Sequence, residues 1–357
     1  LKRTWRLLVM ASNWCNAGEL INYSVGGGWG KENTGGDYIC KVAVIRGADF
    51  PSIDKGEYQG LPIRWERIQK ATNASLQQGD IVIEISGGTE SRPTGRTILI
   101  TKELLETYDC PIIPASFCRL IRCKETVNSV YFYYWLQEMY RAGRTWGYQN
   151  RSTGLSNFQY KTFRNMESVF IPEVDIQRKI ADILLTFDKK RRMLTQLNDY
   201  LAETADSLFI NTFGHLEENA VLSDIANITM GQSPTGASYN NVGNGAVFYQ
   251  GRGEFGWRFP TRRLFTTEPK RMAKAGDILM SVRAPVGDLN IAYEDCCIGR
   301  GLAVINCSYP SFCLYLMRSL CKKLNAYNSE GTVFGSINSK DLKNIEIALP
   351  NVEDIIG

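Results

Sequence analysis

The sequence predicts an α+β protein in which a long central coiled-coil helix joins two similar mixed α/β domains. Three observations predict this fold. Short blocks recur in the same order in both halves of the 357-residue chain, the segments between the blocks differ, and a heptad pattern of apolar residues separates the halves. The predicted boundaries are residues 1–172 and 214–350 for the domains, 173–213 for the helix, and 351–357 for the start of a second, truncated helix.

The repeat consists of strand-like and helix-like blocks. GDIVIEISGG at residues 79–88 and GDILMSVRAP at residues 276–285 both place a Gly-Asp turn before a run of β-forming residues. The aromatic runs at residues 130–137 and 311–319 each predict a packed helix. The other matching blocks are 19–26 with 224–231, 115–123 with 299–307, and 157–175 with 336–354. Five blocks in one order indicate duplication, whereas the inserts at 27–78 and 232–275 share almost nothing.

The segment between the two copies predicts one long helix. Its apolar positions over residues 176–208 alternate at spacings of four and three, with polar breaks at Lys190 and Thr204. Pro172 precedes this segment and Gly214 follows it, as expected at a helix start and stop. Such a helix would be about 55 Å long at about 1.5 Å per residue, and its apolar seam needs a partner helix. The seam residues expected to contact that partner are Ile180, Ile183, Phe187, Leu194, Leu197 and Leu201.

Composition narrows the class of protein. The net charge of +4 and the pI near 8.4 permit a nucleic-acid partner without requiring one. Ten cysteines without a CxxC pair, together with the single histidine His215, argue against a zinc site. Reduced thiols in a cytoplasmic protein are the favoured interpretation over a disulfide framework. No apolar run is long enough to span a bilayer.

The search for catalytic residues finds little. The chain has no GxxxxGK[ST] phosphate loop, and GGGWG at residues 26–30 lacks the strand and helix of a dinucleotide site. Asp80 and Glu84 lie on one face of a predicted strand and could in principle bind a metal ion. However, the second copy has Ser281 in place of Glu84, which favours a structural pair.

Basic side chains among glycines, turns and aromatic residues are the stronger signal. Arginine suits guanine edges and phosphates, glutamine and asparagine suit adenine, and lysine contacts the backbone. The alternative is a solvated basic face over an aromatic core, and the polar loops near residues 141–157 and 328–340 could equally be helix-capping connections. The candidate DNA contacts are Lys31, Arg64, Arg92, Thr94, Arg96, Arg144 and Arg151 in the first copy, and Gln232, Gln250, Arg252, Arg258, Arg262, Arg263, Thr332, Ser336, Asn338 and Lys340 in the second.

Several motifs together resemble a known family. GDILMSVRAPVGDLNIA at residues 276–292 predicts a strand, a Pro/Gly turn and a second strand, and CIGRGLAVI follows it at 297–305. FIPEVDIQRKIADIL at 170–184 opens the central helix, and GTVFGSINSKDLKNIEIALP at 331–350 closes the second copy. In this order they resemble the specificity subunits of type I restriction–modification systems, over nearly the whole chain.

The resemblance implies a division of labour within a bacterial defence complex. Each target-recognition domain would read one half of a split DNA sequence, and the long helices would set the half-site distance and dock two methyltransferase subunits. Those partners would bind S-adenosylmethionine and methylate adenine, and nuclease-motor subunits that use Mg and ATP could join them. The specificity subunit itself has no catalytic residues and no cofactor. Family members of this layout also have a second helix antiparallel to the first, so we expect the uncovered seam here to self-associate or to bind a partner.

Two other functions stay open on sequence alone. A coiled-coil adaptor with two protein-binding domains would explain the helix but not the two dissimilar basic inserts. A stand-alone metal-dependent DNA nuclease would need a pair of carboxylates, and the second copy has lost the counterpart of Glu84.

Overall fold

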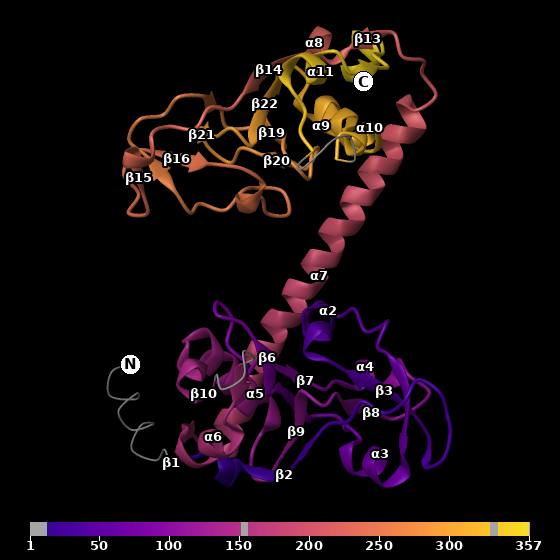
Figure 1. The fold of residues 1–357 in the computed structure, drawn as a ribbon, viewed down its shortest axis with the longest axis vertical. Coiled ribbons are helices and arrows are strands. Elements are labelled where there is room, and N and C mark those ends of the chain that lie inside the picture. Colours follow the sequence, from indigo (N-terminus) through magenta and orange to yellow (C-terminus); the bar gives the residue numbers. More distant parts are fainter. Residues whose placement is uncertain (1–12, 151–155, 329–334, 357) are drawn as a thin grey trace. The chain divides into compact units, whose positions relative to one another are not determined.

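The computed structural model describes residues 13–150, 156–328 and 335–356. The chain divides into two compact units, Leu1–Gln196 and Leu197–Gly357, each built from strands and helices (Figure 1). The long helix α7 (Val174–Phe213) contributes its first part to one unit and its last part to the other. The predicted fold class, two mixed α/β domains with a long helix between them, is confirmed.

The first unit contains two main sheets. The antiparallel sheet has the order β2 (Ile21–Gly26), β9 (Cys118–Cys123), β5 (Ile81–Glu84), β7 (Thr97–Leu99). The second has the order β4 (Ile63–Arg67), β3 (Tyr38–Ile45), β8 (Ile112–Pro114), with β3 and β8 parallel. Smaller strand groups are β1 (Asn13–Asn16) with β12 (Ser168–Ile171), and β10 (Gln149–Asn150), β11 (Ser156–Phe158) and β6 (Ser86–Gly88). The helices are α2 (Phe50–Lys55), α3 (Ile68–Ala74), α4 (Lys102–Glu106), α5 (Ser129–Arg141) and α6 (Tyr160–Met166).

The second unit repeats this plan. Its antiparallel sheet has the order β14 (Ala226–Met230), β22 (Leu302–Cys307), β19 (Ile278–Ser281), β20 (Leu289–Ile291). The other sheet has the order β15 (Tyr239–Asn240), β17 (Phe265–Thr266), β16 (Ala246–Tyr249), β21 (Cys296–Ile298), β18 (Met272–Ala273), with β16 and β21 parallel. The remaining elements are β13 (Ala220–Val221), β23 (Glu346–Ile347), α8 (Leu222–Ile225), α9 (Pro310–Ser319), α10 (Cys321–Ala326), α11 (Ser339–Lys343) and α12 (Val352–Ile356).

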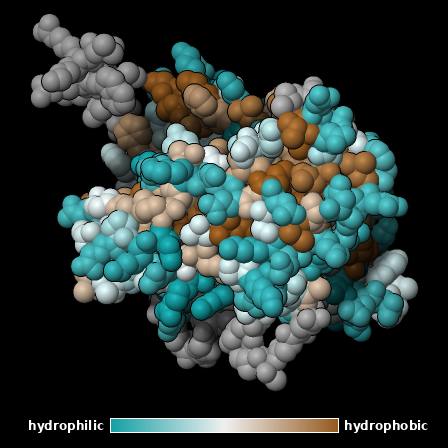
Figure 2. All heavy atoms as spheres, turned by 90° about the horizontal axis from the view of Figure 1, so that it is seen from above, coloured by the Kyte–Doolittle hydropathy of each residue, from teal (hydrophilic) through white to brown (hydrophobic). Residues whose placement is uncertain are grey.

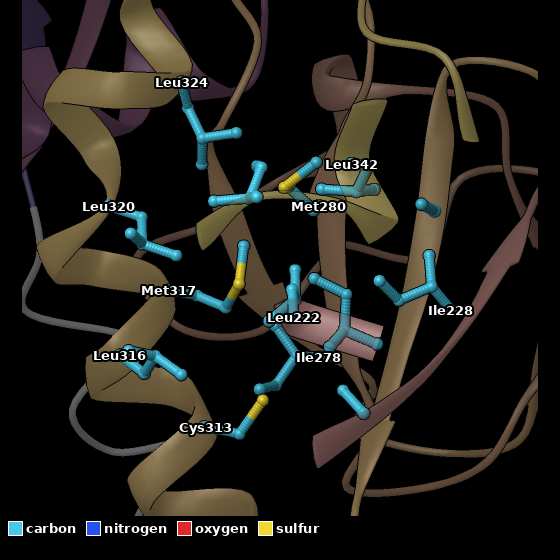
Figure 3. Packing of buried hydrophobic residues seen from close by; sticks show 14 of the residues in the cluster. Leu222, Ile228, Ile278, Met280, Cys313, Leu316, Met317, Leu320, Leu324 and Leu342 are labelled. Carbon is cyan, nitrogen blue, oxygen red and sulfur yellow. The ribbon is translucent and has the colours of Figure 1, made fainter. Parts of the chain in front are cut away.

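Helix α9 closes the core of the second unit over the antiparallel sheet. Its apolar side chains Leu316 and Met317 point toward Ile278 and Met280 of β19, and Leu342 of α11 lies in the same cluster (Figure 3). All five are buried, so the predicted aromatic helix is confirmed as a packed one. Helix α5 has the same place in the first unit, where it packs on β5 and β9.

The Gly-Asp turn before each central strand is explained by its hydrogen bonds. Asp80 accepts the backbone N–H of Gln77 at 2.7 Å, and Asp277 accepts that of Lys274 at 2.7 Å. The glycine before each aspartate has a left-handed backbone, with φ of +86° at residue 79 and +92° at residue 276, which other residues rarely adopt. Both residues of the motif therefore shape the turn that leads into the strand.

The repeat extends into segments whose sequences differ. The backbone N–H of Ala115 donates to the carbonyl of Ile45 at 2.8 Å, and that of Gly299 donates to Tyr249 at 2.8 Å. These bonds flank the parallel pairs β3/β8 and β16/β21, which occupy equivalent places in the two units. The inserts were expected to share almost nothing, but each contains one strand of the common frame, β3 in the first and β16 in the second.

Helix α7 confirms the predicted central helix and leaves its seam exposed. The only buried side chains along it, among the described residues, are Gln177 and Ala181. Gln177 accepts the backbone N–H of Asn128 at 2.9 Å and donates to the carbonyl of Pro172 at 2.8 Å, which fixes the start of the helix on the first unit. The six seam residues Ile180, Ile183, Phe187, Leu194, Leu197 and Leu201 are all 37–66% exposed.

The surface mixes polar and apolar residues. The face in Figure 2 carries hydrophilic side chains interspersed with smaller hydrophobic groups. Among the described residues, no helix combines the length and the apolar character that crossing a membrane requires.

Candidate nucleic-acid interface

Glu84 organises the loop that follows β5. Its side chain is 3% exposed and binds two candidate arginines, Arg92 at 2.9 Å and Arg96 at 2.7 Å. Arg96 also donates to the carbonyl of Gly47 at 2.8 Å, and its hydrogen bond to Glu84 raises its pKa. The two guanidinium groups are thus fixed by an internal carboxylate, with Arg92 the more exposed of the two at 35%.

Asp80 and Glu84, the two carboxylates on one face of β5 and its preceding turn, each have an arginine partner. Asp80 binds Arg122 at 2.7 Å, and Glu84 binds the arginines of the loop. No group of three or more His, Cys, Asp or Glu side chains suited to a metal ion lies within the ranges that the structure describes. Both carboxylates serve to hold loops and turns of the first domain in place.

Thr94 lies beneath the surface rather than on it. Its side chain is 0% exposed, and its hydroxyl donates to the amide oxygen of Gln149 at 2.6 Å. Ser156 donates to the same oxygen at 2.7 Å. In this structure Thr94 is buried and stabilises the loop through Gln149, so its side chain is not accessible to DNA.

Lys31 and Arg64 belong to a basic and aromatic cluster on the first insert. The Arg64 guanidinium lies 4.5 Å from the ring centre of Trp29, and the Lys31 ammonium lies 4.6 Å from that of Tyr38. Such stacking orders the cationic groups while leaving hydrogen-bond donors available. Arg64 also binds Glu32 at 2.8 Å, an acidic side chain that is 79% exposed.

Arg144 lies near the end of α5 and binds Glu167 at 2.8 Å, with its guanidinium 5.3 Å from the ring centre of Trp135. Glu167 is buried and caps the end of α6, so this ion pair connects the segment after α5 to the junction between α6 and β12. The candidates Arg151 and Thr332 lie outside the described residues.

In the second domain, two of the candidate arginines between β16 and β17 have acidic partners. Arg252 binds Asp288, and Arg262 binds Glu294. All four side chains are partly exposed. These ion pairs therefore orient the arginines, and breaking them to bind another group costs little free energy.

The other candidates of the second insert lie on the surface. Arg258 lies 5.9 Å from the ring centre of Phe259, and Arg263 has no ion-pair partner in the described parts of the chain. Gln232 and Gln250 are exposed. Gln250 directly follows β16, and Gln232 lies two residues after the end of β14.

The loop before α11 is partly a helix cap. The Asn338 side chain accepts the backbone N–H groups of Lys340 and Asp341, each at 2.9 Å. Asn338 thus acts as the N-cap of α11, which matches the helix-capping interpretation of this loop. Ser336 is exposed and forms an isolated β-bridge with Arg283, and Lys340 is exposed.

Two arginines that the sequence analysis did not select line a cavity of about 240 Å³ in the second domain. Arg283 and Arg300 share it with the candidates Gln250 and Arg252 and with Ser233. Both belong to repeated blocks, which were interpreted as scaffold only. The first copy has Ser86 and Ser116 at the matching positions. This difference between the copies is the sequence signal that could have identified the two arginines.

Two copies of one frame with differing basic loops define a tandem recognition protein. A family model for the type I restriction modification DNA specificity domain matches residues 41–203 and again residues 218–354. The chain belongs to this family, and the resemblance noted from its motifs is confirmed.

One curated relative comes from Methanocaldococcus jannaschii and carries the name MjaX specificity subunit of a type I restriction enzyme. It is 36% identical over 207 residues, which are 52% of this chain and 49% of the relative. The chain therefore matches about half the length of that relative.

Solved structures of specificity subunits are also similar. The S subunit of a type I system from M. genitalium has a TM-score of 0.57 at 13% identity, covering 94% of this chain and 84% of the other, and supports the fold alone. The HsdS subunit from Thermoanaerobacter tengcongensis has a TM-score of 0.37 at 22% identity, with 97% and 86% covered.

Proposed function

We propose that this chain is the non-catalytic DNA-specificity subunit of a type I restriction–modification complex. Residues 1–172 and 214–350 would each read one half of a two-part DNA target, and residues 173–213 would connect the two readers. The observation that carries the proposal is one frame present twice with different insert loops. A shared frame would orient both domains on DNA in the same manner. Different loops would let each domain recognise a different DNA sequence.

The basic side chains fall into two groups, those placed to contact DNA and those that hold a loop in shape. In the first domain Lys31 is exposed and lies over the Tyr38 ring, and Arg64 lies over Trp29 with its side chain 16% exposed. Arg96 is held by a buried carboxylate. We infer that Lys31 contacts DNA directly, that Arg64 reaches DNA from beside Trp29, and that the Glu84 network keeps the neighbouring loop in shape. In the second domain Gln232, Gln250, Arg258 and Arg263 would be the direct contacts.

The exposed seam of α7 supports a role in assembly. Apolar side chains of the size of Phe187 and Leu201, at 66% and 54% exposure, are costly to leave in water. We infer that methyltransferase subunits, or a second helix, cover them and that the helix sets the distance between half-sites. S-adenosylmethionine, and Mg with ATP where cleavage occurs, would bind to those partner subunits.

A methylation map tests the proposal. The full chain would be expressed with a methyltransferase subunit of its own system in a host without other adenine methylation, and modified adenines would be located by single-molecule sequencing. We expect a two-part motif with a fixed unspecified gap. A stable complex that methylates no site would contradict the specificity role and favour the adaptor function.

A further inference from the structure

The cavity beside Arg283 and Arg300 lies where four strands of the second domain end. Ser233 follows β14, Gln250 follows β16, Arg283 follows β19 and Arg300 follows β21. The carboxyl ends of strands from both sheets therefore meet at one place, and the cavity of about 240 Å³ lies between their loops. At about 30 Å³ for each water molecule in the liquid, this is room for a phosphate group and several waters.

The charge of the cavity is not balanced from within. Arg252 binds Asp288, but neither Arg283 nor Arg300 has a side-chain hydrogen bond or ion pair in the parts of the chain that the structure describes. No acidic side chain is among the described residues that line the cavity. Two free guanidinium groups at one cavity favour an anion, and their planar forks match the oxygens of a phosphate.

Backbone contacts fix the segment that carries Arg300. The Arg300 N–H donates to the Ser233 hydroxyl at 3.3 Å, and the Gly301 N–H donates to the carbonyl of Gln250 at 3.2 Å. A Cβ atom on Gly301 would lie 2.8 Å from that same carbonyl oxygen, so only glycine allows this approach. Arg300 is thus presented by a closely packed backbone.

The first domain provides an internal comparison. The N–H of Ile85 donates to the carbonyl of Phe117 at 2.8 Å, and the N–H of Val282 donates to Gly301 at 3.0 Å. These matching bonds align Arg283 with Ser86 and Arg300 with Ser116. The first domain has serine at both places, so the paired arginines are a feature of the second domain alone.

We propose that Arg283 and Arg300, which line one cavity with Ser233, bind a backbone phosphate of the DNA recognised by the second domain. This inference rests on the proposed DNA-recognition function and adds to it a contact that carries no sequence information. The site holds the duplex in register, while the insert loops read bases.

The test replaces the two arginines by the residues of the first domain. The Arg283→Ser/Arg300→Ser variant of the full chain is titrated with a duplex carrying the mapped two-part target and with a duplex of scrambled sequence, over a range of salt concentrations. Because the same frame accepts serine at residues 86 and 116, the variant should fold, and its thermal unfolding is checked against the parent. Lys322→Ser/Lys343→Ser removes the same charge from exposed positions on α10 and α11 and is the control.

We expect the affinity for both duplexes to fall about tenfold or more in the arginine variant, as for a lost charged contact. The slope of log K against log salt should become shallower by about 0.9, the value for one phosphate. The lysine control should show neither change. A neutral methylphosphonate at the contacted position of the duplex should weaken the parent and leave the arginine variant unaffected, and excess inorganic phosphate at constant ionic strength should compete only weakly.

Three results would overturn the inference. Unchanged affinity and salt slope in the arginine variant would show that the cavity does not contact DNA. A change in the preferred half-site would show that the arginines read bases instead. Strong competition by inorganic phosphate would identify a site for the free anion. Failure of the parent chain to prefer its target would instead reject the proposed function, and the parent titration alone reveals it.

Discussion

Glu84 and Ser281 occupy the same place at the ends of β5 and β19, and both are buried. Glu84 fixes the following loop through two arginines. Ser281 fixes its loop by donating to the carbonyl of Pro285 at 2.7 Å and accepting the N–H of Asp288 at 2.9 Å. Different chemistry performs the same task, which explains why the carboxylate can be absent from one copy.

Replacing Glu84 by Gln should destabilise the first domain. The change leaves two arginines without their carboxylate, and we expect unfolding free energy to fall by about 3 kcal/mol, as when one partner of a buried ion pair is removed. Urea unfolding followed by tryptophan fluorescence measures it, since all but Trp257 of the seven tryptophans precede residue 197. Glu32→Gln, which removes an exposed partner of Arg64, should cost less than about 1 kcal/mol. Equal losses in the two variants would count against the structural role of Glu84.

The cysteines should be reduced and mostly unreactive in the native protein. Burial raises the pKa of Cys118 and of Cys296 to about 12, so at pH 8 only about one thiol in ten thousand is ionised at each site. Cys321 is exposed and should react first with a thiol reagent. All ten cysteines should react once the chain is unfolded. Rapid native modification of Cys118 or Cys296, located by mass spectrometry, would contradict the packing described here.

At the scale of elements, local patterns were sufficient for some parts of the fold. The alternating spacing predicted α7, and the Gly-Asp turns predicted β5 and β19 at both copies. The parallel pairs β3/β8 and β16/β21 were not predicted. Each pair joins strands about 50 or more residues apart, and pairing of that kind leaves no local periodicity in the sequence.

For the candidate site, too, local sequence selected some residues, and others depended on the tertiary structure. Residue type and position selected basic side chains on both inserts, among them Lys31, Arg64 and Arg263, and their contact with DNA stays a prediction. Thr94 was selected as one of the polar residues among the glycines and turns of this region, but only the three-dimensional packing shows that it is buried and bonded to Gln149. Arg283 and Arg300 were missed because a cavity formed by four strand ends depends on tertiary structure.

The seam of α7 should drive association of the chain when no partner is present. Phe187→Glu and Leu194→Glu place charges on the seam and should shift the chain toward monomer in sedimentation velocity, because an apolar interface then has to bury a charge. Met193→Glu is the control, since this exposed residue lies next to Leu194 in the chain but off the seam. A parent chain that stays monomeric at the highest concentration reached would contradict the expectation.

At the scale of the whole molecule, two domains of one family carry different recognition loops. The matched regions, residues 41–203 and 218–354, contain the same frame of strands and different charged side chains. Selection can change one insert while the frame and the other insert stay intact. The proposed two-part DNA target, with each part read by one domain, rests on this arrangement.

Exchange of one insert tests that claim most directly. Residues 232–275 would be replaced by the matching segment of a relative with a different target, and methylated adenines would be mapped in the same host. The account predicts that one half of the motif changes while the other half and the gap are retained. The reciprocal exchange of residues 27–78 should change only the other half. A motif altered in both halves by either exchange, or unaltered by both, would contradict the account.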